Sequence, residues 1–201
     1  MRLMVFSDLH RDVEVARRLA KQSGEADIVV GAGDFATKRK GLLEVIDALA
    51  QINRPSILVP GNSESVEELA EACARWPAAN VLHGSGVEIL GTTFWGMGGA
   101  VPVTPFGSWS CDYSEEEARG LLADCPLHAI LVSHSPPRGA VDQSSQGENL
   151  GSMAIAETVE RCHPPLVVCG HVHESAGCST TVSGTPVVNA GPQGIIWEIP
   201  D

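Results

Sequence analysis

The sequence predicts an α/β fold, because its first sixty residues alternate strand-like and helix-like segments and its second half is richer in strands. Such alternation with short connections favours parallel strands joined by right-handed crossovers. The chain has 201 residues, of which 43% are hydrophobic, and this size suits one domain with a full core. We therefore expect a single domain over residues 1–201.

The first half of the chain supplies three strands and the helices between them. The expected strands are short apolar runs that end at a glycine or a polar residue: 2–7, the run that starts at Ile28, and 55–59. Residues 13–22 form the first helix, because their apolar side chains share one stripe and Gly24 follows as a stop signal. Residues 41–50 form a second amphipathic helix, and a capping box marks the start of a third at Ser65 and Glu68.

The pattern changes at Asn80. Short strand-like segments at 81–82, 87–90 and 92–97 follow one another with glycines and no helix between them, which is typical of antiparallel hairpins. Beyond them we expect helices at 114–123 and 152–162, strands at 129–132 and 166–169, and up to three closing strands within 180–199. Two polar loops, 98–113 and 139–151, are long for a compact domain, and such loops are usually functional or mobile.

Composition narrows the classes of partner. The net charge of −12 disfavours binding to nucleic acid or to an acidic membrane, because both need Lys and Arg to displace counterions. Asp8 follows Met1 within one strand length, which leaves no room for a signal peptide, and no apolar run reaches the roughly 18 residues of a membrane-spanning helix. The six cysteines form no Cys-x-x-Cys pair, so a reduced, cytoplasmic setting is expected. A small soluble substrate is the expected partner, and a homo-oligomer stays open.

Five expected strands end on side chains that commonly bind metal ions. Asp34 ends the run from Ile28, and the others are Asp8 with His10, Asn62, His134, and His171 with His173. Open α/β sheets place their chemistry at the carboxyl ends of strands, so we expect one polar cluster around Asp34. In an extended segment Asp8 and His10 would point the same way, with Leu9 in the core. This mixture of ligands suits divalent Mn, Fe, Zn, Co or Ni, and two ions served by so few ligands need one bridging carboxylate.

The blocks around these residues resemble a known family. They read Asp8-x-His10, Gly33-Asp34, Gly61-Asn62-x-Glu64, Ser133-His134 followed by Pro136-Pro137, and Gly170-His171-x-His173. One block alone is weak, but five in order over residues 8–173 resemble the calcineurin-like metallophosphoesterases in their small, single-domain bacterial and archaeal form. The resemblance implies a four-layer α-β-β-α sandwich of two mixed β-sheets flanked by helices.

Carried over residue by residue, the resemblance also implies a ligand set for two divalent ions, with manganese as the first choice. The ligands of one ion would be Asp8, His10, Asp34 and His173. The ligands of the other would be Asp34, Asn62, His134 and His171, so that Asp34 bridges. In the family such ions share a hydroxide that attacks the phosphorus in line. The implied enzyme is a phosphoric ester hydrolase whose catalytic residues are Asp34, Asn62, His134 and Glu64.

One position departs from the family pattern. Ser63 stands where the family usually has a histidine that protonates the leaving oxygen or steadies the phosphate. A serine hydroxyl is a poor general acid at neutral pH, so we expect phosphodiesters or activated esters to react faster than alkyl phosphomonoesters. Glu64, which would support the missing histidine, is left either to act as the acid or to cap the following helix.

Three histidines and one serine that are not predicted ligands could have structural or surface roles as well as functional ones. His83 closes a short strand and is expected to be a hydrogen-bonded structural residue, although it could reach the site. His128 and His163 stand beside prolines and are expected on the surface. Ser135 could orient His134, contact phosphate, or simply form a turn.

Four further residues stay open. Asn189 ends a strand and could support the metal site or form a plain turn, and Arg138 could bind phosphate as a guanidinium fork. Phe106 and Trp109 could form an aromatic wall for a base or aryl leaving group, pin their own loop, or meet a second subunit.

The leading hypothesis is a cytoplasmic two-metal phosphoesterase, with phosphodiesters favoured. Its rivals are a scaffold or adaptor that keeps the fold without catalysis, and a broad-specificity phosphomonoesterase. The complete set of seven ligands argues against the scaffold, and only Ser63 favours it. A nuclease is disfavoured by the acidic charge, and a protein phosphatase by the short chain.

Overall fold

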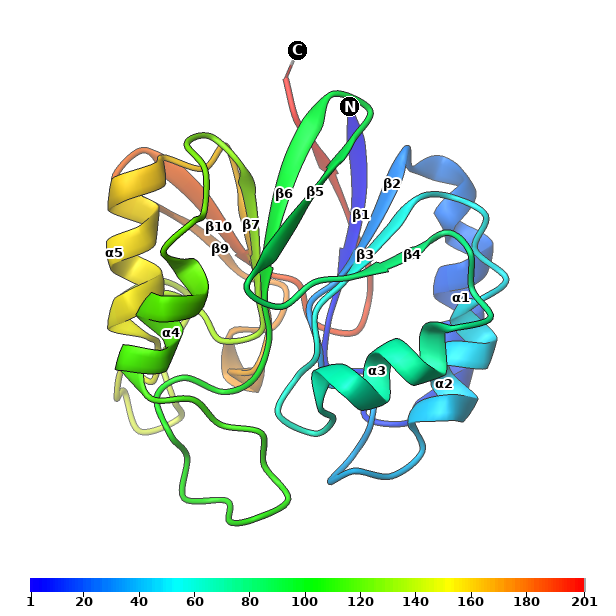
Figure 1. Cartoon of the computed structure of the whole chain (residues 1–201), viewed down its shortest axis with the longest axis horizontal. Coiled ribbons are helices and arrows are strands. Elements are labelled where there is room, and N and C mark those ends of the chain that lie inside the picture. The colour runs from blue at the N-terminus through cyan, green and yellow to red at the C-terminus, as the bar shows by residue number, and fades with distance from the viewer. Residues whose placement is uncertain (201) are drawn as a thin grey trace.

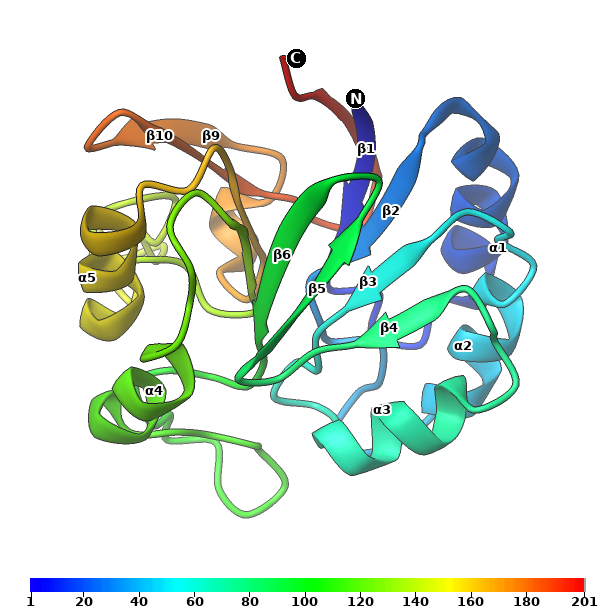
Figure 2. The ribbon, with the colours of Figure 1, turned by 45° about the horizontal axis from the view of Figure 1, so that its top comes forward.

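The computed structural model describes residues 1–200 and contains two β-sheets packed face to face (Figure 1). Helices α1 to α3 cover the outer face of one sheet, and α4 and α5 cover the outer face of the other (Figures 1 and 2). The predicted four-layer α-β-β-α sandwich is therefore confirmed.

The first sheet has the strand order β11-β1-β2-β3-β4. Its strands are β1 (Arg2–Phe6), β2 (Ile28–Gly31), β3 (Ser56–Leu58), β4 (Ala79–Val81) and β11 (Ile195–Glu198). Strands β1 to β4 run parallel, and β11 lies antiparallel beside β1. The crossovers between the parallel strands are α1 (Val13–Gln22) with the short η1 (Ser23–Glu25), α2 (Leu42–Leu49) and α3 (Val66–Cys73).

The second sheet has the strand order β5-β6-β7-β8-β10-β9. Its strands are β5 (Ser85–Ile89), β6 (Thr92–Met97), β7 (Ile130–Ser133), β8 (Val167–Cys169), β9 (Ser179–Val182) and β10 (Thr185–Asn189). The four central strands run parallel, and the edge strands β5 and β9 run antiparallel to their neighbours. Its helices are α4 (Glu115–Leu122) and α5 (Met153–Cys162), and η2 (His173–Ser175) follows β8.

Strands β1, β2 and β7 bury both of their faces. In β1, Leu3 and Val5 pack between the two sheets, whereas Met4 and Phe6 pack under α1 to α3. Successive side chains of a strand point to opposite faces, so a strand covered on both sides needs apolar residues throughout. This is why β1, β2 and β7 appear in the sequence as continuous apolar runs rather than as alternating ones.

The hairpin prediction beyond Asn80 was wrong for the first of its three strands and right for the other two. Strand β4 pairs parallel with β3 in the first sheet, and β6 pairs parallel with β7; only β5 and β6 form a hairpin. The absence of a helix between β4 and β5 reflects a chain that passes directly from one sheet to the other, because β4 and β5 are the edges of different sheets. Local sequence does not distinguish such a passage from a hairpin.

Two findings bear on the expected setting. Within residues 1–200, the structure contains no helix with both the length and the apolar character needed to cross a membrane. All six cysteines are free thiols.

Candidate metal centre

The seven predicted ligands lie close together at the carboxyl ends of five parallel strands from both sheets. Asp8 and His10 follow β1, Asp34 follows β2, and Asn62 follows β3. His134 follows β7, and His171 and His173 follow β8. The side chains converge because the strands of the two sheets end beside one another, as the hydrogen bonds from His134 Nδ1 to Ala32 O (2.8 Å) and from His171 N to Asp8 Oδ2 (3.1 Å) illustrate.

The backbone at the ligands is in a conformation that side chains disfavour. Asp8, His10, Asp34 and His171 have φ between 45° and 68°, in the left-handed region, where strain costs on the order of 1–3 kcal/mol each. The expectation that Asp8 and His10 lie in an extended segment was therefore wrong, although Leu9 is buried as expected. The chain turns sharply after β1, and hydrogen bonds from Asp8 N to Gly33 O (2.9 Å) and from His10 N to Asp34 O (3.0 Å) hold the turn.

Two groups of acidic and histidine side chains could each hold an ion. Asp8, His10 and His173 form one, and Asp8, Asp34 and His134 form the other, with ligand atoms within 4.8 Å of one another in each group. Asp34 faces both: its Oδ2 lies 3.7 Å from His10 Nε2, and its Oδ1 lies 3.5 Å from His134 Nε2. The two oxygens of one carboxylate are thus presented to two sets of histidines.

The two histidines of the fifth block divide between these groups. The ring of His171 packs against that of His134, and the ring of His173 against that of His10, with centroids 4.9 Å apart in both pairs. Asn62 lies on the His134 side, since its Oδ1 is 3.2 Å from His134 Nε2.

Backbone carbonyls fix which ring nitrogen is available on two of the histidines. His134 Nδ1 donates to Ala32 O at 2.8 Å, and His10 Nδ1 donates to Ala36 O at 3.2 Å. A carbonyl can only accept, so in the neutral ring the proton is on Nδ1 and the lone pair of Nε2 faces the cluster. Neutral imidazoles oriented by backbone acceptors are the usual form of metal-binding histidines. The donor set of this chain therefore fits divalent metal ions.

Burial and neighbouring charges act on the titration of this cluster. Burial raises the pKa of Asp8, but its hydrogen bond with His173 and the charge of His134 outweigh this effect and bring the pKa down to about 2. Burial lowers the pKa of His171 to about 4, with a further lowering by His134. Burial also lowers the pKa of His134, but the carboxylates of Asp34 and Asp8 raise it above the usual value. The centre thus combines carboxylate with a neutral His171, which suits metal binding.

Ser63 contacts the bridging carboxylate. Its backbone N donates to Asp34 Oδ1 at 2.8 Å, and its hydroxyl donates to Asp34 Oδ2 at 3.2 Å. Gly61 lies against the other side of the same carboxylate, where a Cβ would collide with Asp34 Oδ1. The third block therefore holds Asp34 in place as well as supplying Asn62.

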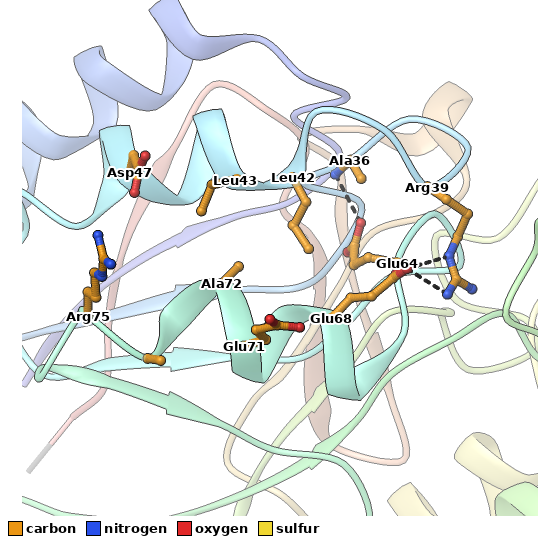
Figure 3. Close-up of a pocket in the computed structure, with 11 residues that line it drawn as sticks. Ala36, Arg39, Leu42, Leu43, Asp47, Glu64, Glu68, Glu71, Ala72 and Arg75 are labelled. Carbon is orange, nitrogen blue, oxygen red and sulfur yellow. Dashed lines mark hydrogen bonds and ion pairs between the residues drawn. The ribbon is translucent and has the colours of Figure 1, made fainter.

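Glu64 binds backbone rather than reaching the cluster. Its carboxylate is fully buried and accepts hydrogen bonds from Gly61 N (2.7 Å), Ala36 N (2.9 Å) and Phe35 N (3.3 Å), of which the Ala36 contact is visible in Figure 3. Burial and the charge of Asp34 raise its pKa to about 7, against the lowering effect of the Gly61 and Ala36 N–H groups. Glu64 thus ties the loop after β2 to the loop after β3.

The alternative in which Glu64 caps the following helix was wrong. Ser65 caps α3, in a capping box with Glu68.

A cavity of about 460 Å³ lies between α2 and α3, and Glu64 is among the residues that line it. Its charged lining also includes Arg39, which forms an ion pair with Glu68 at 2.8 Å (Figure 3).

A cavity of about 560 Å³ opens onto the metal cluster. Its floor includes Asp34, Asn62 and three of the histidines, and its mouth includes Phe106, Trp109 and Leu150 from the two long loops. The rings of Phe106 and Trp109 stack at 5.6 Å and an interplanar angle of 8°, and the Lys38 ammonium lies 5.5 Å from the Trp109 ring centroid. A polar floor and a partly aromatic mouth therefore share one cavity.

Three residues of loop 98–113 that no sequence pattern singled out are connected to this centre, one of them by a direct contact with Asn62. Asn62 Nδ2 donates to Ser110 Oγ at 2.9 Å, Ser110 Oγ donates to Asp112 Oδ1, and Thr104 donates to Asp112 Oδ2 from both its backbone N and its hydroxyl at 2.7 Å. Small polar residues in a long loop carry no local signal of such contacts.

Three residues whose roles the sequence left open make hydrogen bonds that indicate those roles. Asn189 Nδ2 donates to Gly170 O (3.1 Å) and Val172 O (2.9 Å), so it supports the segment that carries His171. Ser135 Oγ accepts from Val101 N at 2.9 Å, and Arg138 donates to Asn149 O at 3.1 Å, so both fix loops.

The histidines outside the ligand blocks lie as expected. His83 Nδ1 accepts from Gly98 N at 3.1 Å, and its ring packs against Tyr113. His128 and His163 are exposed.

The chain matches the calcineurin-like phosphoesterase superfamily domain over residues 1–198. A UPF0046 protein of Caenorhabditis elegans is 26% identical over 185 residues, which cover 83% of this chain and 62% of that relative. The chain thus spans less than two thirds of the length of this curated relative.

Solved structures share the fold. The TT1561 protein of Thermus thermophilus superposes with a TM-score of 0.77 at 17% identity, over 99% of both chains. A dimetal phosphatase from Danio rerio superposes with a TM-score of 0.62 at 13% identity, over 94% of this chain and 86% of that one. At these identities the likeness concerns the fold.

Proposed function

Because the chain belongs to the calcineurin-like phosphoesterase superfamily, we propose that it is a two-metal phosphoesterase that hydrolyses a small phosphate ester, with phosphodiesters favoured. The observation that supports the proposal most directly is Asp34, whose two oxygens face different histidine pairs. We assign Asp8, His10, Asp34 and His173 to one ion. We assign Asp34, Asn62, His134 and His171 to the other, with manganese as the first metal to try.

Several residues of the chain hold the proposed metal ligands in position. Two divalent ions, when bound, would lower the pKa of a water molecule and neutralise phosphoryl oxygens. Ser63 and Gly61 hold Asp34, Ala32 O holds the His134 ring, and Glu64 fixes both loops. We therefore assign Glu64 a positioning role in place of the acid role that the sequence left open. The half-exposed His10 and His173 face the cavity through which a substrate enters.

The proposed preference for diesters depends on Ser63. Its hydroxyl is directed to Asp34 and is a poor proton donor to a leaving oxygen at neutral pH. Leaving groups of low pKa do not need such a donor. The aromatic mouth adds a second feature, since a flat substituent on the phosphate can pack against Phe106.

The test is hydrolysis of bis-p-nitrophenyl phosphate and p-nitrophenyl phosphate by metal-stripped protein resupplied with Mn²⁺. We expect metal-dependent turnover that is faster on the diester. A high rate on glycerol phosphate would contradict the preference and favour a broad phosphomonoesterase. Mn²⁺ binding without turnover of any ester would favour the scaffold, the alternative that Ser63 supports.

The proposed setting is the cytoplasm. The six free thiols support a reducing compartment, where disulfides are rare.

A further inference from the structure

We propose that Asp112 is a positioning residue that fixes the Asn62 amide in its metal-binding orientation through Ser110. The inference uses the proposed metal site and needs no particular substrate.

The contacts form one chain from the loop to the ligand. Asp112 Oδ1 accepts the Ser110 hydroxyl hydrogen, and Ser110 Oγ accepts from Asn62 Nδ2 at 2.9 Å. At the far side of the amide, Asn62 Oδ1 lies 3.2 Å from His134 Nε2. The backbone repeats the connection, because Cys111 N donates to Asn62 O at 2.9 Å.

The chemistry of an amide makes this orientation decisive. Asn62 has one atom that can bind a cation, its Oδ1, whereas its NH₂ group only donates. A serine hydroxyl could donate to the amide oxygen or accept from the amide nitrogen, so Ser110 alone does not choose between the two orientations. Asp112 can only accept and takes the hydroxyl hydrogen, which leaves Ser110 to accept from Nδ2. The Asn62 oxygen is thereby turned toward His134 and the cluster.

The same carboxylate also closes the loop at the cavity mouth. Thr104 donates to Asp112 Oδ2 from its backbone N and its hydroxyl, and Ser110 donates to Oδ1. Phe106 and Trp109, which line the mouth, lie between these two anchors. Asp112 therefore connects the mouth of the cavity with a ligand on its floor.

The experiment measures Mn²⁺ binding to the full chain after metal stripping, by calorimetric titration, for Asp112→Ala, Asp112→Asn and Ser110→Ala. The matched control is Asp142→Ala, because Asp142 closes the other cavity loop by accepting from Gly139 N (2.9 Å) and Gly151 N (3.0 Å) and is hydrogen-bonded to no predicted ligand. Circular dichroism checks that each variant is folded.

We expect Asp112→Ala and Ser110→Ala to weaken one of two Mn²⁺ sites by about 10- to 100-fold, as loss of an outer partner of a ligand does. We expect a smaller loss in Asp112→Asn, whose amide oxygen can still accept from Ser110, and unchanged affinities in Asp142→Ala. Ester turnover by Asp112→Ala and by Ser110→Ala should recover at excess Mn²⁺.

Equal affinities in wild type and in the loop variants would overturn the inference, and so would an equal loss in Asp142→Ala or a wild type that binds no metal. If Asp112→Ala fails to fold, Ser110→Ala decides the question in its place. Mn²⁺ binding that follows the expected pattern without ester hydrolysis would overturn the proposed function and leave this inference standing.

Discussion

The ligands on the two sides of Asp34 differ in their exposure to solvent. The His134 side chain is fully buried, whereas the side chains of His10 and His173 are 30% and 59% exposed. His134 is hydrogen-bonded to the backbone of Ala32 at the carboxyl end of β2, and Asn62 beside it is held by loop 98–113. The fold therefore buries His134 and Asn62, whereas the rings of His10 and His173, and to a lesser extent that of His171, are open to the cavity.

This difference in burial predicts that the two ion sites are unequal. An ion on the inner side would contact His134 and Asn62, whose positions are fixed by hydrogen bonds to Ala32 O and Ser110. An ion on the outer side would contact the more exposed His10 and His173, so we expect it to exchange more easily.

The largest effect is expected from Asp34→Asn, which removes a charge from both sides at once. We expect loss of metal-dependent hydrolysis by more than the roughly 100-fold that an outer partner of a ligand contributes, and weaker binding of both ions. Ester hydrolysis and calorimetric Mn²⁺ titration measure these effects. Asp27→Asn is the control, because the Asp27 carboxylate accepts from Arg2 N at the opposite end of β2. Ester hydrolysis retained in Asp34→Asn would contradict the assignment of Asp34 as the ligand that bridges the two ions.

The next effect separates the two sides directly. We expect His173→Ala to bind one ion more weakly with little change in melting temperature, because this side chain is more than half exposed. We expect His134→Ala to lose metal and also about 1–3 kcal/mol of folding stability, because it leaves Ala32 O unpaired in the core. Thermal unfolding of the metal-free variants together with Mn²⁺ titration provides the comparison. Equal effects of the two substitutions on stability would show that burial does not distinguish the sides.

A smaller and selective effect is expected from Ser63→His. The added imidazole can donate a proton to a leaving oxygen of high pKa, so turnover of glycerol phosphate should rise by at least about 10-fold relative to bis-p-nitrophenyl phosphate, below the ~10²–10⁴ of an optimised general acid. Ser63→Asn has a side chain of similar polarity without a titratable group and serves as the control. An unchanged ratio of monoester to diester rates would show that Ser63 does not set the preference.

The smallest effect is expected at the cavity mouth. We expect Phe106 to contact the ring that does not leave. Phe106→Ala should therefore raise KM for bis-p-nitrophenyl phosphate by roughly 2- to 10-fold, the value of one aromatic contact, and leave KM unchanged for methyl p-nitrophenyl phosphate, which has no second ring. Phe106→Tyr keeps the ring and should behave as wild type. A parallel change with both esters would mean that Phe106 only shapes its loop.

The sequence predicted where the ligands lie better than how they are held. Apolar runs that end on Asp34, Asn62 or His134 are local signals, because strands buried on both faces must change composition where they leave the sheet. The left-handed backbone at Asp8 and His10 and the parallel partner of β4 depend on segments distant in sequence. The chain from Asp112 to Asn62 likewise joins residues 50 positions apart through a loop without periodicity, which no pattern reveals.

The most direct test of two unequal ion sites around one carboxylate is crystallography of the Mn²⁺-soaked protein, with anomalous scattering measured at increasing chelator concentration. The account predicts two peaks on the order of 3.5–4 Å apart, one on each side of Asp34, with the peak beside His10 and His173 fading first. A single peak, two peaks that fade together, or ions bound away from Asp34 would contradict it.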